Sequence, residues 1–123
     1  MAVQIPDNSL WGMAVYRMVN GVNLTGKWNN NRVTERNAIQ LEIARKDEQD
    51  QPGRFPGIYN VSWIEQTGTV ITGTLEITDV DGRESEWVWR NEGREVLFQG
   101  VGMQISENEV TVIYWHGSPP LLS

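Results

Sequence analysis

The sequence predicts an all-β protein, an antiparallel up-and-down barrel of about eight strands. Alternation of apolar and polar residues, the period of a half-buried strand, recurs along most of the chain. Short turn sequences join most of these segments, and short turns make successive strands antiparallel neighbours. Closing such strands into a barrel leaves no free sheet edge. A twisted two-sheet sandwich is the alternative, and no segment reads as a convincing helix.

The first two predicted strands form a hairpin. Segment 10–19 is rich in apolar and aromatic residues and ends at Asn20–Gly21, a pair typical of a type I′ turn. Segment 23–28 follows, with Leu24 and Trp28 on one face. The pattern therefore predicts antiparallel pairing across this turn.

The third strand is predicted over 39–45, although the segment contains good helix formers and Thr34 precedes it as a candidate cap. At about 100° per residue, a helix would point Leu41 nearly opposite to Ile39 and Ile43. A strand instead places all three on one face. We therefore predict a strand that buries Ile39, Leu41 and Ile43.

The second half of the chain follows a polar loop at 46–57 with two Pro-Gly pairs. Five further alternating segments are predicted as strands, at 58–65, 69–78, 84–90, 95–105 and 110–115. Their predicted inward residues are Tyr59, Val61, Trp63, Ile71, Gly73, Leu75, Ile77, Trp87 and Trp89.

The length of 123 residues indicates one barrel domain, 1–123, with short mobile ends at 1–9 and 116–123. The absence of Cys excludes disulfides, thiolate metal sites and cysteine catalysis.

The charge balance argues against two classes of partner. Ten Lys and Arg against 16 Asp and Glu give a net charge of −6, which repels nucleic acid and anionic membrane surfaces. No apolar run has the length of a membrane span, and the N-terminal sequence has no signal-peptide pattern. We expect no nucleic-acid or membrane partner, and a cytoplasmic location is favoured.

The residues that could serve in catalysis or metal binding are better explained as solvent-exposed or turn residues. The single histidine, His116, stands in a Pro-rich tail where solvation is expected. Asp79, Asp81 and Glu84 lack the spacing of an EF-hand loop and suit a β-turn. Glu84 and Glu86 share the strand face opposite to the tryptophans and are expected to face water. We therefore predict no catalytic residue, no metal site and no cofactor.

Six tryptophans are many for this length, and they are either core or the walls of a pocket. In the pocket hypothesis Trp63 faces Trp87 or Trp89, and Tyr59 shares the face of Trp63. Gly73, on the strand between them, is expected to leave space beside the indoles.

Three segments resemble the avidin and streptavidin family. "LTGKWNNN" (24–31) is similar to its first strand, in which an Asn follows the Trp two positions on. "VSWIEQTGTVITGTLEI" (61–77) and "DVDGRESEWVWR" (79–90) are similar to its later strand pairs, in the same order.

The resemblance implies a calycin-type barrel and gives roles to four residues. Asn30 occupies the position from which members of this family donate a hydrogen bond to a ureido ring. Trp63 and Trp87 stand where its indoles enclose the ligand, and Thr67 lies near its hydroxyl ligands. A biotin-like ligand is the corresponding expectation.

Together these observations predict a non-enzymatic barrel that binds a small ligand of unknown identity. The predicted ligand-binding residues are Asn30, Tyr59, Trp63, Thr67, Trp87 and Trp89. The alternative is a protein-interaction or inhibitor module with a filled barrel. We also expect a homodimer or larger oligomer, because the aromatic residues cannot all point inward.

Overall fold

The computed structural model describes residues 3–4, 10–31, 40–47, 53–65, 67–116 and 121–122. The barrel strands are β2 (Trp11–Val19), β3 (Asn23–Asn30), β4 (Gln40–Lys46), β5 (Gly57–Ile64), β6 (Val70–Asp79), β7 (Glu84–Arg90), β8 (Val96–Ser106) and β9 (Glu109–His116). Two short strands, β1 (Val3–Gln4) and β10 (Leu121–Leu122), form a separate ribbon. Every element in the described residues is a strand, as predicted.

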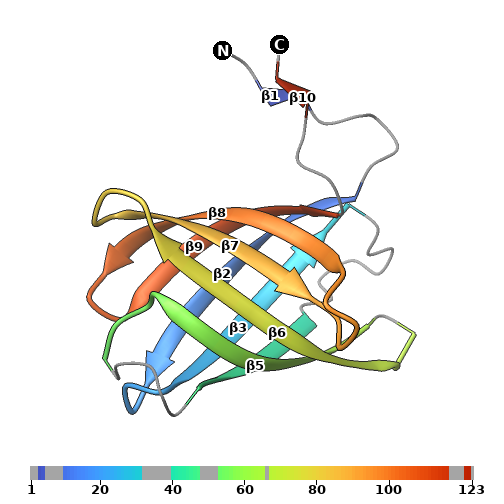
Figure 1. Cartoon of the computed structure of the whole chain (residues 1–123), viewed down its shortest axis with the longest axis horizontal. Coiled ribbons are helices and arrows are strands. Elements are labelled where there is room, and N and C mark those ends of the chain that lie inside the picture. Colours follow the sequence, from blue (N-terminus) through green and yellow to red (C-terminus); the bar gives the residue numbers. More distant parts are fainter. Residues whose placement is uncertain are drawn as a thin grey trace.

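The eight longer strands form a closed barrel in chain order (Figure 1). Each strand pairs antiparallel with its neighbours in sequence, and β9 pairs with β2 to close the wall. At the closure Trp11 lies opposite Trp115. The predicted up-and-down barrel is confirmed, and the two-sheet sandwich is not formed.

The turn between β2 and β3 has the predicted backbone. Asn20 has φ 56° and Gly21 has φ 71°. Two successive residues with positive φ are the mark of a type I′ turn. This turn sets the β2–β3 register, in which Tyr16 faces Gly26.

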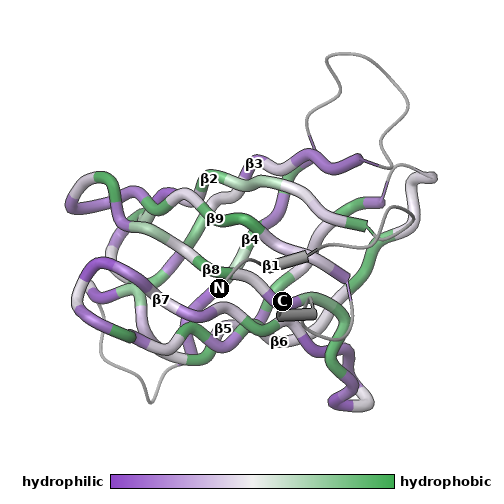
Figure 2. Tube along the Cα trace, turned by 90° about the horizontal axis from the view of Figure 1, so that it is seen from above, coloured by the Kyte–Doolittle hydropathy of each residue, from purple (hydrophilic) through white to green (hydrophobic). Residues whose placement is uncertain are grey.

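Side chains alternate between the interior and the outer surface along the strands. On β2 every second residue from Gly12 to Met18 is buried, and the residues between them are exposed. Figure 2 shows apolar and polar residues distributed along all the barrel strands, so the colouring by itself does not mark the inner face. Trp63, Trp87 and Trp89 are all buried inside, as predicted.

The predicted face of β4 was wrong. Leu41 and Ile43 are 58% and 64% exposed, while Glu42, Ala44 and Lys46 point inward. A change of one residue in register moves a whole strand from one face to the other. Here the hydrogen-bonded neighbours decide the face, because Glu42 pairs with inward residues on both sides, Gly26 on β3 and Trp63 on β5. Ile39 lies outside the described residues.

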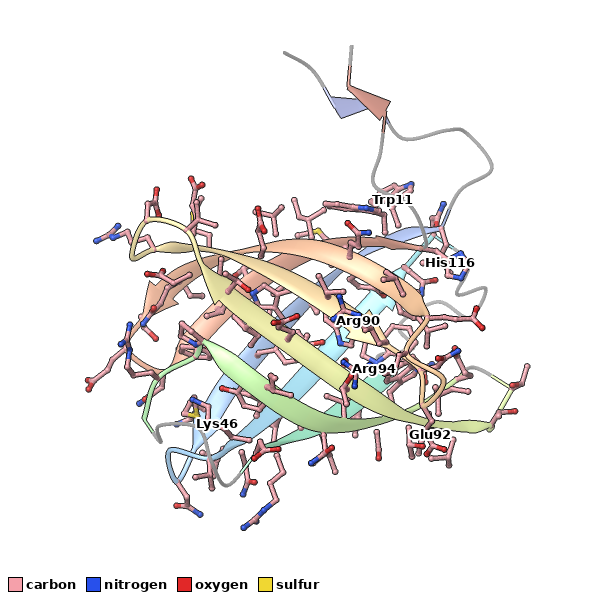
Figure 3. All side chains as sticks on the ribbon, viewed as in Figure 1. Trp11, Lys46, Arg90, Glu92, Arg94 and His116 are labelled. Atoms are coloured by element: carbon pink, nitrogen blue, oxygen red, sulfur yellow. The ribbon has the colours of Figure 1, made fainter. Side chains whose placement is uncertain are left out.

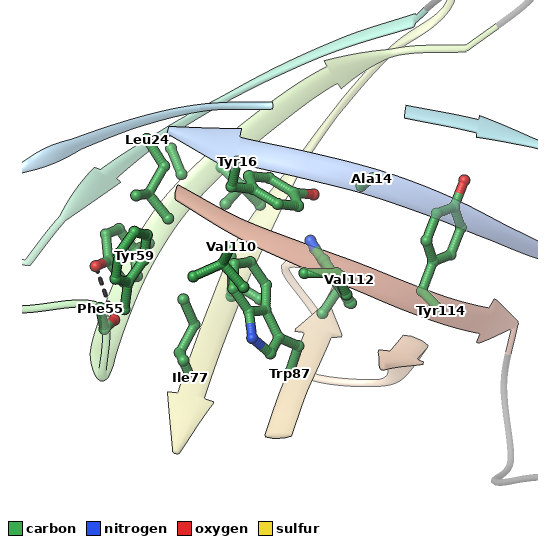
Figure 4. Packing of buried hydrophobic residues seen from close by; sticks show 14 of the residues in the cluster. Ala14, Tyr16, Leu24, Phe55, Tyr59, Ile77, Trp87, Val110, Val112 and Tyr114 are labelled. Atoms are coloured by element: carbon green, nitrogen blue, oxygen red, sulfur yellow. Dashed lines mark hydrogen bonds between the residues drawn. The ribbon is translucent and has the colours of Figure 1, made fainter. Parts of the chain in front are cut away.

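The barrel end that carries the β2–β3 turn is filled with side chains (Figure 4). Leu24, Tyr59, Phe55 and Val110 are buried there. The Tyr59 hydroxyl donates a hydrogen bond to the Phe55 carbonyl at 2.8 Å. The Lys46 ammonium donates to the Arg54 carbonyl.

The chain ends meet in the β1–β10 ribbon, where Val3 faces Leu122 and Gln4 faces Leu121. The tail pattern predicts no strand partner, whereas Leu121–Leu122 has one. The expected mobility of 1–9 and 116–123 stays a prediction.

Candidate functional site

A cavity of about 200 Å³ lies inside the other end of the barrel, where β3, β5 and β7 end. Its lining is mostly aromatic, with a few polar groups: Leu10, Tyr16, Trp28, Asn30, Glu42, Trp63, Glu65, Trp89, Phe98, Tyr114 and His116. Figure 3 shows His116 at this end of the barrel and Lys46 at the filled end.

The aromatic walls hold one another through ring contacts. Phe98 makes edge contacts with Trp63 at 5.9 Å and with Tyr114 at 5.7 Å between ring centroids. Trp28 also meets Tyr114 edge-on at 6.5 Å, and Trp89 lies 6.0 Å from it. Edge-to-face pairs are favourable, so these contacts hold the rings in defined orientations.

Two glycines make room for two of the lining tyrosines. A Cβ atom on Gly26 would lie 2.4 Å from the Tyr16 ring, and one on Gly12 would lie 2.6 Å from the Tyr114 ring. Both are cross-strand partners of the tyrosine that they accommodate. The glycine positions in β2 and β3 therefore allow these rings to lie inside a narrow barrel.

A buried carboxyl group forms part of the inner wall. Glu42 is 5% exposed, and its two oxygens accept separate hydrogen bonds. The Tyr16 hydroxyl donates to Oε1 at 2.6 Å, and the Trp89 indole N–H donates to Oε2 at 3.0 Å. Burial raises the pKa of Glu42 to about 7, against the two hydrogen bonds, which lower it.

Other polar groups lie towards the mouth. The Asn30 amide donates to the Tyr114 hydroxyl at 3.3 Å, and that hydroxyl donates to the Asn29 carbonyl at 3.2 Å. Burial raises the pKa of Tyr114, so the phenol stays neutral and keeps its proton for donation. The Trp63 indole N–H donates to Glu65 at 3.1 Å.

The structure brings together three of the residues predicted from the sequence. Asn30, Trp63 and Trp89 all line the cavity. Trp87 lies beneath it and is fully buried, with its ring 4.7 Å from that of Tyr16. Its indole N–H is satisfied by the Ser85 hydroxyl at 2.8 Å. Trp87 therefore supports the cavity wall from below.

The other two predicted residues lie elsewhere. Tyr59 belongs to the filled end of the barrel, where its hydroxyl is bonded to the main chain. Thr67 is exposed in the β5–β6 connection, and its hydroxyl lies 3.2 Å from that of Thr69. Neither lines the cavity.

Sequence reasoning missed the polar centre of the site. Glu42 was assigned to the outer face because Leu41 and Ile43 flank it in an alternating strand. Tyr16 and Tyr114 carry no motif of their own. Gly12 and Gly26 could have indicated the site, because both lie within predicted strands. Glycine in a strand marks a place where a neighbouring group approaches closely.

Gly73 does not open space beside the indoles, contrary to the expectation. A Cβ atom there would lie 2.1 Å from the carbonyl oxygen of Arg90. The next residue, Thr74, pairs with Arg90, so the main chain of β7 passes directly beside Gly73. Gly73 is therefore required by backbone contact.

The acidic turn between β6 and β7 is confirmed as a turn. Asp79 accepts the Gly82 N–H at 2.9 Å, and Asp81 accepts the Glu84 N–H at 2.8 Å. Hydrogen bonds from the Glu84 and Arg83 N–H groups lower the pKa of Asp81. Glu84 and Glu86 are exposed, as expected. Within the described residues no group of three or more His, Asp or Glu is placed to hold a metal ion.

Comparison with protein-family models, curated proteins and solved structures finds no match. The architecture is consistent with a calycin-like barrel. The part of the chain that the structure describes contains no helix long and apolar enough to cross a membrane.

Proposed function

We propose that the protein binds a small ring-containing ligand in the cavity at the β3, β5 and β7 ends, without catalysing its conversion. The supporting observation is a set of interlocked aromatic walls around one buried polar group. Binding sites for small molecules typically combine apolar walls with a few placed polar groups. A dry cavity of about 150 Å³ already accepts benzene, so about 200 Å³ suits a single substituted ring.

Binding is favoured over catalysis by the composition of the lining. The described lining residues include no Ser, Thr, Cys or Lys that Glu42 or His116 could activate as a nucleophile. The resemblance to the avidin family adds Asn30 and Trp63, which line the cavity, and a biotin-like ligand is one candidate. Trp87 and Thr67 would take no direct part.

Tryptophan fluorescence tests this function. A panel of small aromatic and heterocyclic compounds, with biotin included, is titrated into the protein. We expect at least one compound to change the emission saturably, because Trp28, Trp63 and Trp89 line the cavity. Trp63→Ala should weaken that binding by about tenfold or more, the effect of losing one desolvated aromatic contact.

The matched control is Trp11→Ala. Trp11 is 42% exposed on the outer face of β2, so its loss should leave affinity unchanged. Equal losses in the two variants, or no saturable change with any compound, would contradict a binding cavity.

A second function is favoured by the outer surface. Apolar side chains project from three adjacent strands, β8, β9 and β2: Trp11, Met13, Val15, Val101, Met103 and Ile113. Met13 faces Ile113, which in turn faces Val101, so the residues are continuous across the strands. We name this set the outer apolar stripe, and it supports an interaction module as the alternative function.

A further inference from the structure

The polar groups of the cavity are biased towards negative charge. Glu42 and Glu65 both line it, and the described lining contains no Lys or Arg. Glu42 has no ion-pair partner among the described residues. A buried ionised carboxylate is costly unless a positive charge compensates it.

The hydrogen bonds of Glu42 leave it able to bind more donors. Each carboxylate oxygen has two lone pairs, and each accepts one bond, from Tyr16 or from Trp89. These bonds fix the orientation of the group from β2 and β7. A ligand with N–H groups can reach the remaining lone pairs.

The walls around Glu42 suit a cation as well. Trp28, Trp63, Trp89 and Tyr114 line the same cavity. The faces of such rings attract organic cations, most strongly where water is excluded. An ammonium or amidinium group could therefore contact the faces of the aromatic rings and form an ion pair with the carboxylate at the inner end.

We propose that the cavity binds a small organic cation, an amine or amidine carried on a single ring, with Glu42 as its counter-ion. This inference rests on the proposed function and names its ligand class. An anionic ligand would be repelled by Glu42 and Glu65. A neutral ligand would leave the charge of Glu42 uncompensated.

The proposal predicts a dependence on pH. The groups that face Glu42 or the cavity are Tyr16 from β2, Tyr114 and His116 from β9, and Glu65 after β5. Burial raises the pKa of both tyrosines, so they stay neutral. Protonation of Glu42 removes the counter-ion, so cation binding should weaken by up to about tenfold for each pH unit below about 7.

Three compounds of matched shape provide the test: benzamidine, a cation; benzamide, which is neutral; and benzoate, an anion. Binding is measured by calorimetry and tryptophan fluorescence at pH 8 and pH 5.5. We expect benzamidine to bind at least about tenfold tighter than the other two at pH 8, and to lose most of this advantage at pH 5.5.

Glu42→Gln should remove the preference for benzamidine and its pH dependence. Glu86→Gln makes the same change in charge on the exposed face of β7, and it should keep both. A pH dependence that survives in Glu42→Gln and disappears in His116→Asn would assign it to the histidine at the mouth and refute Glu42 as the counter-ion. Circular dichroism establishes that each variant is folded. The pH series on the wild type tests the proposal even if a variant fails to fold.

Two outcomes would overturn the cation site in different ways. Equal binding of the three compounds, or a preference that survives in Glu42→Gln, refutes the cation inference and leaves a binding cavity. No binding of any of the three refutes it as well, and counts against the proposed function itself.

Discussion

Glu42 combines a high degree of burial with well-made hydrogen bonds, and the two act on its charge in opposite directions. The bonds from Tyr16 and Trp89 favour the carboxylate, whereas burial favours the neutral acid and is the larger effect. The folded protein therefore holds the Glu42 proton more tightly than the unfolded chain does.

The stability of the wild type should consequently depend on pH through Glu42. Because its pKa is raised from 4.5 to about 7, the stabilisation is fully present below pH 4.5. It is lost as the pH rises through about 7, by an amount on the order of 3 kcal/mol. Glu42→Gln cannot ionise and should escape this loss.

Urea unfolding at pH 4 and pH 8 measures the difference in free energy between wild type and Glu42→Gln. This difference should shift in favour of the variant at pH 8. Glu86→Gln, altered at an exposed position, should show no comparable shift. A difference that stays constant with pH would mean that Glu42 does not carry a raised pKa.

At the scale of the residue, sequence patterns located two aromatic residues of the cavity wall, Trp63 and Trp89, and missed the other aromatic residues and the polar centre. Trp63 and Trp89 were found because their neighbours in the strand are apolar on the same side. Glu42 was placed on the wrong face because an alternating pattern separates the two faces of a strand without showing which face points into the barrel. That choice is made by pairing with β3 and β5, which a single segment does not contain.

At the scale of the element, the strands follow from local signals. Turn chemistry at Asn20–Gly21 and at Asp79–Gly82 fixes where strands end. Irregularities in pairing are harder to predict, because they depend on two strands at once. The shift in the β7–β8 pairing at Trp89 and Arg90 is of this kind. The contact of Gly73 with the Arg90 carbonyl likewise depends on two strands, β6 and β7.

Gly73→Ala should destabilise the barrel by about 1–3 kcal/mol, the cost of overpacking a rigid contact. The added methyl meets the carbonyl oxygen of Arg90, which is main chain and cannot rotate away. Gly93→Ala is the matched control, since its nearest neighbour is the Asn91 side chain at 3.4 Å. Thermal unfolding compares them, and equal melting temperatures would refute the backbone contact.

At the scale of the whole molecule, closure of the barrel was predictable because most connections are short and favour sequential pairing. The division of the barrel into a filled end and a hollow end could not be predicted from the sequence. It depends on where Phe55, Tyr59 and Val110 meet across the interior. The alternating pattern of a single strand carries no information on this three-dimensional arrangement.

The outer apolar stripe bears on the assembly of the molecule. An exposed apolar surface over adjacent strands is typical of a protein interface. We expect a homodimer at micromolar concentration, with Met13 and Ile113 at its centre. Light scattering after gel filtration measures the mass, and Met13→Glu should give the monomer. A monomeric wild type would refute this prediction.

Thr25→Glu is the control for Met13→Glu. Thr25 is exposed on β3, outside the outer apolar stripe, so the added charge should leave the mass unchanged. A monomer in both variants would indicate general charge repulsion and not a specific surface.

The pairing of β9 with β2 also matters while the chain is being made. A ribosome synthesises β9 last of the barrel strands, so the nascent sheet exposes the unpaired edges of β2 and β8 until then. Both edges border the outer apolar stripe, which makes them prone to join another chain. A delay in the docking of β9 would therefore prolong an aggregation-prone state of the chain, and a chaperone that covers the two open edges would reduce the risk.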